Sequence, residues 1–421
     1  MRKTVVENAD NRARKSAVKR AGPVIAGGLF ASCVAGAAYA GQIQTVFVIA
    51  MENHNWTQPA GETPGQIFGS PFAPYINSLV TPGNPNAAQV SYASNYSNAG
   101  PGIHPSEPNY IWSEAGSNLG VFNDNDPFQV PGGTNQTTTN SLSNYLQTAG
   151  KTWRSYQEDT DINLTNNTVL PKSQYTVPLS SFSGTFTTGS NQYNGSNQYN
   201  YAAKHNPQVF FTPTNGGNNS TNTNPLAQNY APLQQLQTDL TNNTVAQYNW
   251  ITPDQYNDMH STLAGGFTYN GVHLTGDAAN IAQGDNFLSM VVPEIEASQA
   301  YKNNGAIVIW WDETENADDP QHTLGEIIIS PDAKGNAYTN DILYTHSSDL
   351  LTMQEIFNVG PCLLAACTAN DLSDLFVAGA IPNQITTNLV PEPTSGLLLL
   401  GGLLGLGLIG RRRLSYSALP L

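Results

Sequence analysis

Two uninterrupted apolar runs mark the interior of the expected fold. Residues 45–50 and 306–311 form two runs that are apolar apart from Thr45 at the start of the first, and acidic side chains follow them at Glu52 and at Asp312. Runs that are apolar on both faces are typical of central strands in a parallel sheet, buried above and below. Because such strands deliver their carboxyl ends to one edge of the sheet, we expect a functional site at that edge.

Other periodic segments complete the predicted architecture. Residues 326–331 predict another core strand, and apolar positions at helical spacing predict helices over 142–149, 285–300 and 348–358. Strands that alternate with helices favour the α/β class. We therefore expect a mostly parallel central sheet flanked by helices.

A polar stretch interrupts this pattern between about residues 161 and 243. It is rich in Asn, Thr, Ser, Gln and Tyr, and the five residues 190–194 recur as residues 196–200. One repetition is too little for a repeat architecture. We interpret the stretch as a polar Asn/Thr-rich insertion over the site and treat residues 41–390 as one domain.

Charge is distributed unevenly along the 421 residues. The chain has 16 Lys+Arg and 31 Asp+Glu, but seven of the basic residues lie in residues 1–40 and three more at 411–413. The strongly acidic body that remains repels the phosphate backbone of nucleic acids, so DNA and RNA binding are excluded as functions. Carboxylates also bind hard cations, which leaves metal binding open.

The N-terminal segment has the features of an export signal. Residues 1–20 are basic, residues 24–38 are apolar and small, and Ala38-Tyr39-Ala40 gives the small-x-small pattern that signal peptidase cleaves. We predict that residues 1–40 are a signal peptide. The alternative is an N-terminal membrane anchor.

The C-terminal segment, residues 391–421, has three parts in order. Pro391-Glu392-Pro393 precedes a Leu- and Gly-rich span over 394–410, which ends at the basic residues 411–413. A span of this length just crosses a bilayer, with the basic end on the cytoplasmic side. The tail resembles the PEP-CTERM sorting signal of exosortase systems in Gram-negative bacteria.

That resemblance implies a route for the protein. Signal peptidase and exosortase would be its processing partners, and residues 394–410 would anchor it transiently in the inner membrane. Cleavage near the Pro-Glu-Pro would then release it to the cell surface, the extracellular matrix or the medium. A permanent C-terminal anchor is the alternative. Cys362 and Cys367 remain after removal of the signal peptide, either as a disulfide or as two reduced buried thiols.

Chemically able side chains gather in four segments. Carboxylates and imidazoles at strand ends, together with a hydroxyl on a Pro-flanked turn, are the parts of a metal-assisted nucleophile site. A serine hydroxyl is a poor nucleophile at neutral pH, and coordination to a dication favours its alkoxide. The segments are 52–54, 104–110, 252–260, and 312–313 with 345–348.

With these segments in order, the chain resembles the phosphoesterase family of the alkaline phosphatase superfamily, which contains bacterial phospholipases C and acid phosphatases. The likeness runs from Thr45 to about Leu375 and includes residues 146–158, 204–207 and 284–287. It implies an alkaline phosphatase-like fold and a phosphoric ester hydrolase that acts on phosphate mono- or diesters through a phosphoserine intermediate. The alternative is a matrix-associated, catalytically inactive binding or structural protein with the same fold.

The resemblance also implies a role for individual residues. Ser106 would be the nucleophile, and Asn109 would donate to a phosphoryl oxygen. One or two divalent metal ions would be bound, Zn²⁺ being the first choice and Mn²⁺ or Ca²⁺ the others, with Asp254 an alternative to Asp258 as a ligand. The implied metal ligands are Glu52, Asn53, Ser106, Asp258, His260, Asp312, Glu313 and His346.

Three local features depart from the family pattern or stand beside it. The usual Asp-x-x-x-His spacing is absent before His260, and residues 314–319 replace the expected glycine-rich stretch. His322, further on, is either a phosphate contact or a surface residue. Residues 123–126 (Asn-Asp-Asn-Asp) form either an Asx-rich turn or a Ca²⁺ loop.

Overall fold

The computed structural model describes residues 41–382 and residue 385. The predicted signal peptide, residues 1–40, and the predicted sorting signal, residues 391–421, lie outside the described residues. Among the helices that are described, none combines the length and the apolar character needed to cross a bilayer.

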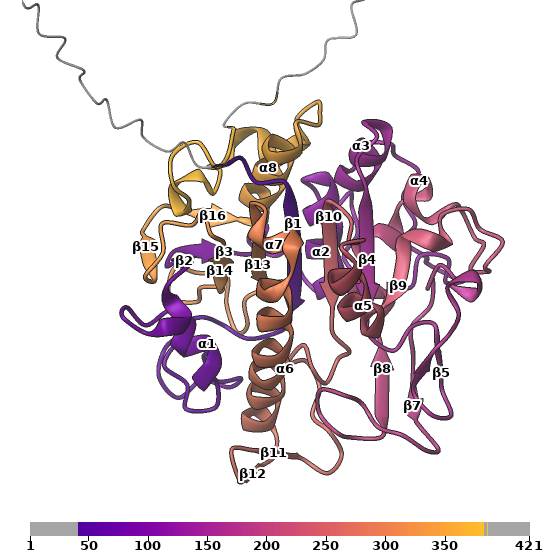
Figure 1. Cartoon of the computed structure of the whole chain (residues 1–421), viewed down its shortest axis with the longest axis horizontal. Coiled ribbons are helices and arrows are strands. Elements are labelled where there is room, and N and C mark those ends of the chain that lie inside the picture. The colour runs from indigo at the N-terminus through magenta and orange to yellow at the C-terminus, as the bar shows by residue number, and fades with distance from the viewer. Residues whose placement is uncertain (1–40, 383–384, 386–421) are drawn as a thin grey trace, which may run out of the picture. The chain divides into compact units, whose positions relative to one another are not determined.

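A mixed sheet forms the centre of the fold (Figure 1). Within the described residues it has eight strands in the order β15-β2-β14-β13-β1-β10-β4-β9. In that order the strands are β15 (Tyr338–Asn340), β2 (Val90–Ala93), β14 (Glu326–Ile329), β13 (Gly305–Trp311), β1 (Thr45–Met51), β10 (Tyr248–Thr252), β4 (Trp153–Gln157) and β9 (Tyr230–Pro232).

Most of these strands are parallel. From β13 through β1, β10 and β4 to β9, each strand pairs in parallel with the next, and β2 pairs in parallel with β15. Among the described strands of this sheet, only β14 runs in the opposite direction, antiparallel to both β13 and β2. The structure thus confirms the expected α/β class and the three predicted core strands, the third of which is the antiparallel one.

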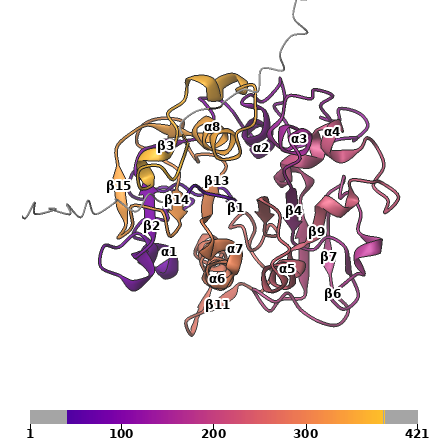
Figure 2. The ribbon, with the colours of Figure 1, turned by 45° about the horizontal axis from the view of Figure 1, so that its top comes forward.

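Helices cover both faces of the sheet (Figures 1 and 2). One group packs together on one face: α2 (Ser106–Ala115), α3 (Leu142–Thr148) and α8 (His346–Phe357). The other group lies on the opposite face: α1 (Pro74–Leu79), α5 (Leu236–Asn242), α6 (Asp277–Ala297) and α7 (Gln299–Lys302). The remaining helix, α4 (Thr212–Asn215), is a single short turn.

The three predicted helices are present, with shifted ends. Helix α6 begins earlier than the predicted residue 285 and ends at Ala297, because Ser298 caps the separate short helix α7. Helix α8 begins at His346, where Thr345 and Ser348 form a reciprocal capping box. This cap fixes the direction in which the chain enters the helix that carries His346.

The polar stretch 161–243 is only partly an insertion. Its last part supplies β9 and α5, which belong to the central sheet and its covering layer, so the predicted insertion is too long at this end. Its earlier part forms two small antiparallel pairs, β5 (Ile162–Asn163) with β6 (Thr168–Val169) and β7 (Phe182–Thr185) with β8 (Gln198–Tyr201). Outside this stretch, two more short pairs are β11 (Phe267–Tyr269) with β12 (Val272–Leu274) and β3 (Tyr96–Ser97) with β16 (Tyr344–Thr345).

Two open alternatives from the sequence are decided by local contacts. Cys362 and Cys367 are joined by a disulfide. In the segment 123–126, the side chain of Asn123 accepts a hydrogen bond from the backbone of Asn125, which is the geometry of an Asx turn. Its two aspartates are occupied with protein donors from other segments.

Candidate functional site

The acidic ends of β1 and β13 lie side by side. Met51 pairs with Trp311, so the residues that follow the two strands meet at the same edge of the sheet. The backbone N–H of Asn53 donates to Asp312 Oδ1 at 3.2 Å, and Asn53 Nδ2 donates to Glu313 Oε1 at 3.2 Å. Asn53 adopts a left-handed φ of 44°, which asparagine tolerates better than most residues and which turns the chain across the strand ends.

Ser106 faces this acidic edge from the first turn of α2. Its hydroxyl donates to Glu52 Oε2 at 3.1 Å and lies 3.4 Å from Glu313 Oε1. The sequence predicted a Pro-flanked turn here; instead Pro105 precedes a helix of ten residues that starts at Ser106. The N-terminus of a helix favours negative charge, so a phosphoryl group at Ser106 would meet a positive backbone dipole.

The residues at this edge fit a divalent cation. Asp312 Oδ2 and Asn53 Oδ1 are buried and have no hydrogen-bond partner in the described part of the chain. Burial, followed by the charges of Glu52 and Glu313, raises the pKa of Asp312 well above its usual value. Unpartnered oxygens among crowded carboxylates are the ligands that hard cations bind, and a cation would relieve the repulsion between them.

Two histidines contact Glu52 from the other side. His205 Nε2 lies 3.3 Å from Glu52 Oε1, and His260 Nδ1 lies 3.4 Å from Glu52 Oε2. His205 Nδ1 is 3.2 Å from Asp258 Oδ2, although neither His205 nitrogen has the alignment of a hydrogen bond. The ligand atoms of Glu52, His205 and His260 all lie within 4.8 Å of one another, which is close enough for a shared metal ion.

Aromatic packing holds His205 in place. The Tyr110 ring stacks on the imidazole at 5.2 Å between centroids, and the Tyr110 hydroxyl donates to Glu52 Oε1. Burial lowers the pKa of His205 well below its ordinary value, despite the attraction of Glu52. A neutral imidazole with both nitrogens near carboxylates is suited to binding a metal ion.

Three residues were predicted around a second metal ion. Asp258 and His260 lie close to each other and to His205, whereas Asp254 lies in a different group. The backbone N–H of His260 donates to Asp258 Oδ1 at 2.8 Å, and Asp258 reaches His205 as described. Asp254 instead has its ligand oxygen beside Glu158 and Asp159. Of the two alternatives left open by the sequence, the structure places Asp258 at the site.

His346 and Asn109 lie at the margin of the site. His346 is buried between Trp310 and Tyr96, with Nε2 3.0 Å from the carbonyl of Trp311 and Nδ1 without a hydrogen-bond partner among the described residues. Burial lowers the pKa of His346 to about 3. Asn109 Nδ2 donates to the carbonyl of Ile103 at 2.9 Å, so one of its two N–H groups positions the loop before Ser106.

Sequence reasoning missed two histidines of the site. His205 was noted only within the matching segment 204–207, and His104 only as a neighbour of Ser106. His104 bridges two carboxylates, with Nδ1 2.6 Å from Glu313 and Nε2 3.0 Å from Asp318. The signal that could have found both is their position in segments that already carried the family resemblance.

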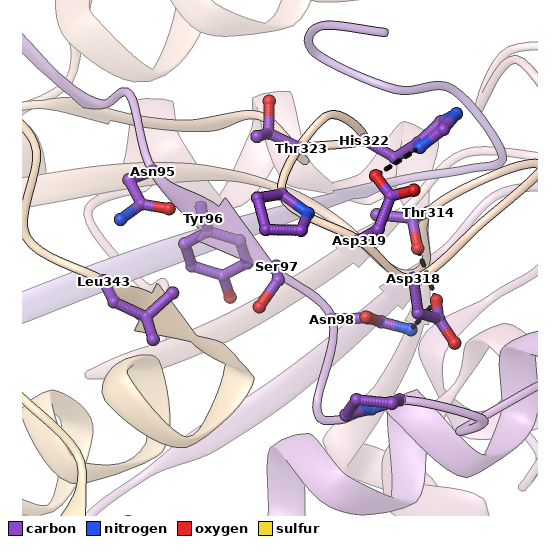
Figure 3. A pocket seen from close by; sticks show the side chains of 12 residues that line it. Asn95, Tyr96, Ser97, Asn98, Thr314, Asp318, Asp319, His322, Thr323 and Leu343 are labelled. Carbon is purple, nitrogen blue, oxygen red and sulfur yellow. Dashed lines mark hydrogen bonds and ion pairs between the residues drawn. The ribbon is translucent and has the colours of Figure 1, made fainter.

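Figure 3 shows a pocket that Asp318 and Thr314 help to line. Its walls come from β3 and the residues after it, from Leu343, and from the segment 314–323, which includes the stretch that replaces the expected glycine-rich one. Asp318 links this pocket to His104 and thereby to Glu313. His322 is not a free surface residue, because it contacts Asp319 and Glu62, each at 2.8 Å.

One family model matches most of this chain. The Phosphoesterase family profile matches residues 88–360, well over half of the chain. Glu52 and Asn53 precede the matched part, and the other predicted site residues fall inside it.

Individual relatives are distant. A phosphate-repressible acid phosphatase of Penicillium chrysogenum is 23% identical over 248 residues, which are 58% of this chain and 47% of that protein. A phosphatidylinositol-3-phosphatase of Mycobacterium tuberculosis is 24% identical over 313 residues, 74% of this chain and 78% of that protein. The matched part of this chain thus spans about half the length of the Penicillium enzyme.

A solved structure of a protein in the alkaline phosphatase superfamily from Vibrio parahaemolyticus also aligns with this chain. It is 11% identical, with a TM-score of 0.39, over 80% of this chain and 72% of that one.

Proposed function

We propose that this chain, which belongs to the phosphoesterase family, hydrolyses phosphate mono- or diesters through a phosphoserine intermediate on Ser106. The observation that carries the proposal is the position of the Ser106 hydroxyl at the start of α2, between Glu52 and Glu313. The two relatives named above are phosphatases, which supports a phosphatase-type activity.

The reaction follows from the placement of these groups. The Ser106 oxygen forms a bond to phosphorus as the bond from phosphorus to the ester oxygen breaks, and the alcohol leaves with a proton. Water then cleaves the serine–phosphate bond and restores the hydroxyl. The backbone N–H groups at the start of α2 stabilise the developing phosphoryl charge, and the carboxylates of Glu52 and Glu313 orient the serine hydroxyl.

A divalent cation at the acidic edge would supply the positive charge that this chemistry needs. Glu52, Asn53, Asp312 and Glu313 would hold it, with His260, Asp258 and His205 available to a second ion. A cation bound there would favour the serine alkoxide and neutralise charge on the phosphoryl oxygens. His260 is 29% exposed, whereas His205 is buried, so His260 is the imidazole of this group that contacts solvent. Because the ligands include both oxygens and imidazole nitrogens, Zn²⁺ is the first candidate, followed by Mn²⁺ and Ca²⁺.

Hydrolysis of p-nitrophenyl phosphate and of bis(p-nitrophenyl) phosphate tests the proposed activity. We expect one or both to be hydrolysed, the rate to fall to background after treatment with a chelator, and activity to return when Zn²⁺, Mn²⁺ or Ca²⁺ is added. Hydrolysis that is unaffected by the chelator would contradict metal dependence. Absence of hydrolysis in metal-loaded protein would favour the alternative of a catalytically inactive binding protein.

We also propose export and C-terminal processing, which rest on the two terminal sequence patterns and are consistent with the disulfide. The mature protein should begin near Gly41 and lack the residues beyond about 393. Intact-mass measurement of protein released from cells that contain the sorting enzyme checks both ends. Retention of residues 411–421 in the released form would contradict the proposed processing.

A further inference from the structure

A second group of carboxylates lies at the same edge of the sheet as the proposed catalytic site. Strands β4 and β10 are parallel neighbours, with Gln157 opposite Thr252. Glu158 and Asp159 follow β4 directly, and Asp254 follows β10 by two residues. The pairing of the strands therefore brings three acidic side chains together, as the pairing of β1 and β13 does on the other side of β10.

All three carboxylates are buried. Glu158 and Asp254 are 1% exposed and Asp159 is fully buried, and one ligand oxygen of each lies within 4.8 Å of the others. Both oxygens of Glu158 receive hydrogen bonds, from Asn257, Asn191 and the backbone of Asp254. By contrast, Asp159 Oδ1 and Asp254 Oδ2 receive a hydrogen bond from no donor in the described part of the chain.

In the described part of the chain, no positive side chain compensates this charge. Among the described residues, no Lys, Arg or His forms an ion pair with any of the three carboxylates. Burial, then the charges of Glu158 and Asp159, raises the pKa of Asp254 well above its usual value. Buried carboxylate charges without a partner are strongly unfavourable, so the group must take up either protons or a cation.

We propose that Glu158, Asp159 and Asp254 bind a hard divalent cation, with Ca²⁺ as the best match, at a site separate from the proposed catalytic metal. The ligand set contains only oxygens, and Ca²⁺ prefers carboxylate and carbonyl oxygens in a flexible arrangement. None of the three residues belongs to the group around Glu52. The two unpartnered oxygens are the atoms left for the ion.

The bound cation would position the loop that carries His260. Asp254 Oδ1 accepts hydrogen bonds from the backbone N–H groups of Tyr256 and Asn257, which holds the turn that leads to Asp258. Asn257 in turn donates to Glu158, so the loop is tied to the acidic group at two points. A cation at Asp254 thus fixes the start of the segment whose end reaches Glu52.

The fold contains a matched control pair. Glu326 and Asp349 are also buried acids with unpartnered oxygens. This group has two carboxyl groups instead of three, and Asp349 accepts a hydrogen bond from Tyr96. Burial, followed by Asp349, raises the pKa of Glu326 well above its usual value. We expect this pair to hold a proton, so Glu326→Gln should leave the metal content unchanged.

Metal analysis and thermal unfolding of the whole purified chain, equilibrated with Ca²⁺ and then dialysed, test the proposal. Wild type should retain tightly bound Ca²⁺ and unfold at a higher temperature in Ca²⁺ than after chelation. Asp254→Asn and Asp159→Asn should each lose one equivalent of Ca²⁺ and the Ca²⁺-dependent rise in unfolding temperature. Glu326→Gln should keep both. Asp312→Asn should keep the equivalent of Ca²⁺ that Asp254→Asn loses. This result would distinguish the new site from the proposed catalytic metal site, whatever the outcome of the activity assays.

Other outcomes would overturn the proposal. An Asp312→Asn variant that binds no Ca²⁺, or an Asp254→Asn variant that keeps as many equivalents of Ca²⁺ as wild type, would contradict it. A higher unfolding temperature of the Asn variants without any change in metal content would show that the acids share a proton instead. If the Asn variants do not fold, titration of Ca²⁺ into chelator-treated Asp312→Asn protein decides the question: one binding event supports the site, and none excludes it.

Discussion

Replacing Ser106 by alanine should abolish hydrolysis while leaving the fold intact. The side chain is small, its hydroxyl contacts the carboxylates of Glu52, Glu313 and Asp312, and the helix start does not depend on a cap from this residue. Loss of a positioned nucleophile typically lowers the rate by several orders of magnitude. Steady-state kinetics on the two chromogenic esters, with circular dichroism to verify the fold, measure the effect.

Two further variants make this result specific. Ser106→Thr should keep part of the activity, because a threonine hydroxyl can occupy the same position. Ser113→Ala is the matched control in the same helix: Ser113 is buried and donates to the carbonyl of Tyr110, so its loss should change stability by about 1 kcal/mol and leave the rate unchanged. Wild-type turnover by the Ser106→Ala variant would contradict the proposed mechanism.

Asp312→Asn and Glu313→Gln should each lower metal occupancy together with the rate. Asp312 contributes an unpartnered buried oxygen, and Glu313 contacts Ser106, Asn53 and His104. Mutation of residues that hydrogen-bond to metal ligands typically lowers metal affinity about 10- to 100-fold, so loss of a ligand itself should lower it at least as much. Metal content after dialysis and titration with Zn²⁺ measure the loss.

Asp319 provides the control for this second prediction. It is 44% exposed and contacts His322, so Asp319→Asn should leave metal binding and rate near those of wild type. Asp318 cannot serve as this control, because it contacts His104, which holds Glu313. Normal metal content in the Asp312→Asn variant would show that Asp312 is not a ligand.

The strand ends of the site were predictable from the sequence for a simple reason. Strand β13 and all of β1 after Thr45 are buried on both faces, so these positions are apolar until the strands end, and the first polar residues after them mark the edge of the sheet. Glu52, Asn53, Asp312 and Glu313 therefore stand out in the sequence.

Other central strands were not predictable in this way. Strand β10 is also fully buried, but Asn249 and Thr252 interrupt its apolar pattern. Asn249 is tolerated there because its Nδ2 group donates to the carbonyls of Val46 and Ala246. Such compensation depends on tertiary contacts, which a local pattern cannot show.

The contribution of His205 was hidden for a related reason. Its segment is polar and has no periodic pattern, and the residue reaches Glu52 only because Tyr110 of α2 packs against its ring. The start of α2 was missed because Pro105 and Pro108 suggest a turn, whereas proline is compatible with the first turn of a helix. Long-range packing therefore decides which imidazoles join the carboxylates.

The most direct test of the account is acid quenching of the enzyme during turnover of a phosphate ester labelled with ³²P, followed by peptide mapping. The account predicts label on the peptide that contains Ser106, and loss of that label in the Ser106→Ala variant. Label on a histidine would point to a phosphohistidine intermediate, and turnover without any labelled residue would point to direct attack by water; either result would contradict a phosphoserine intermediate.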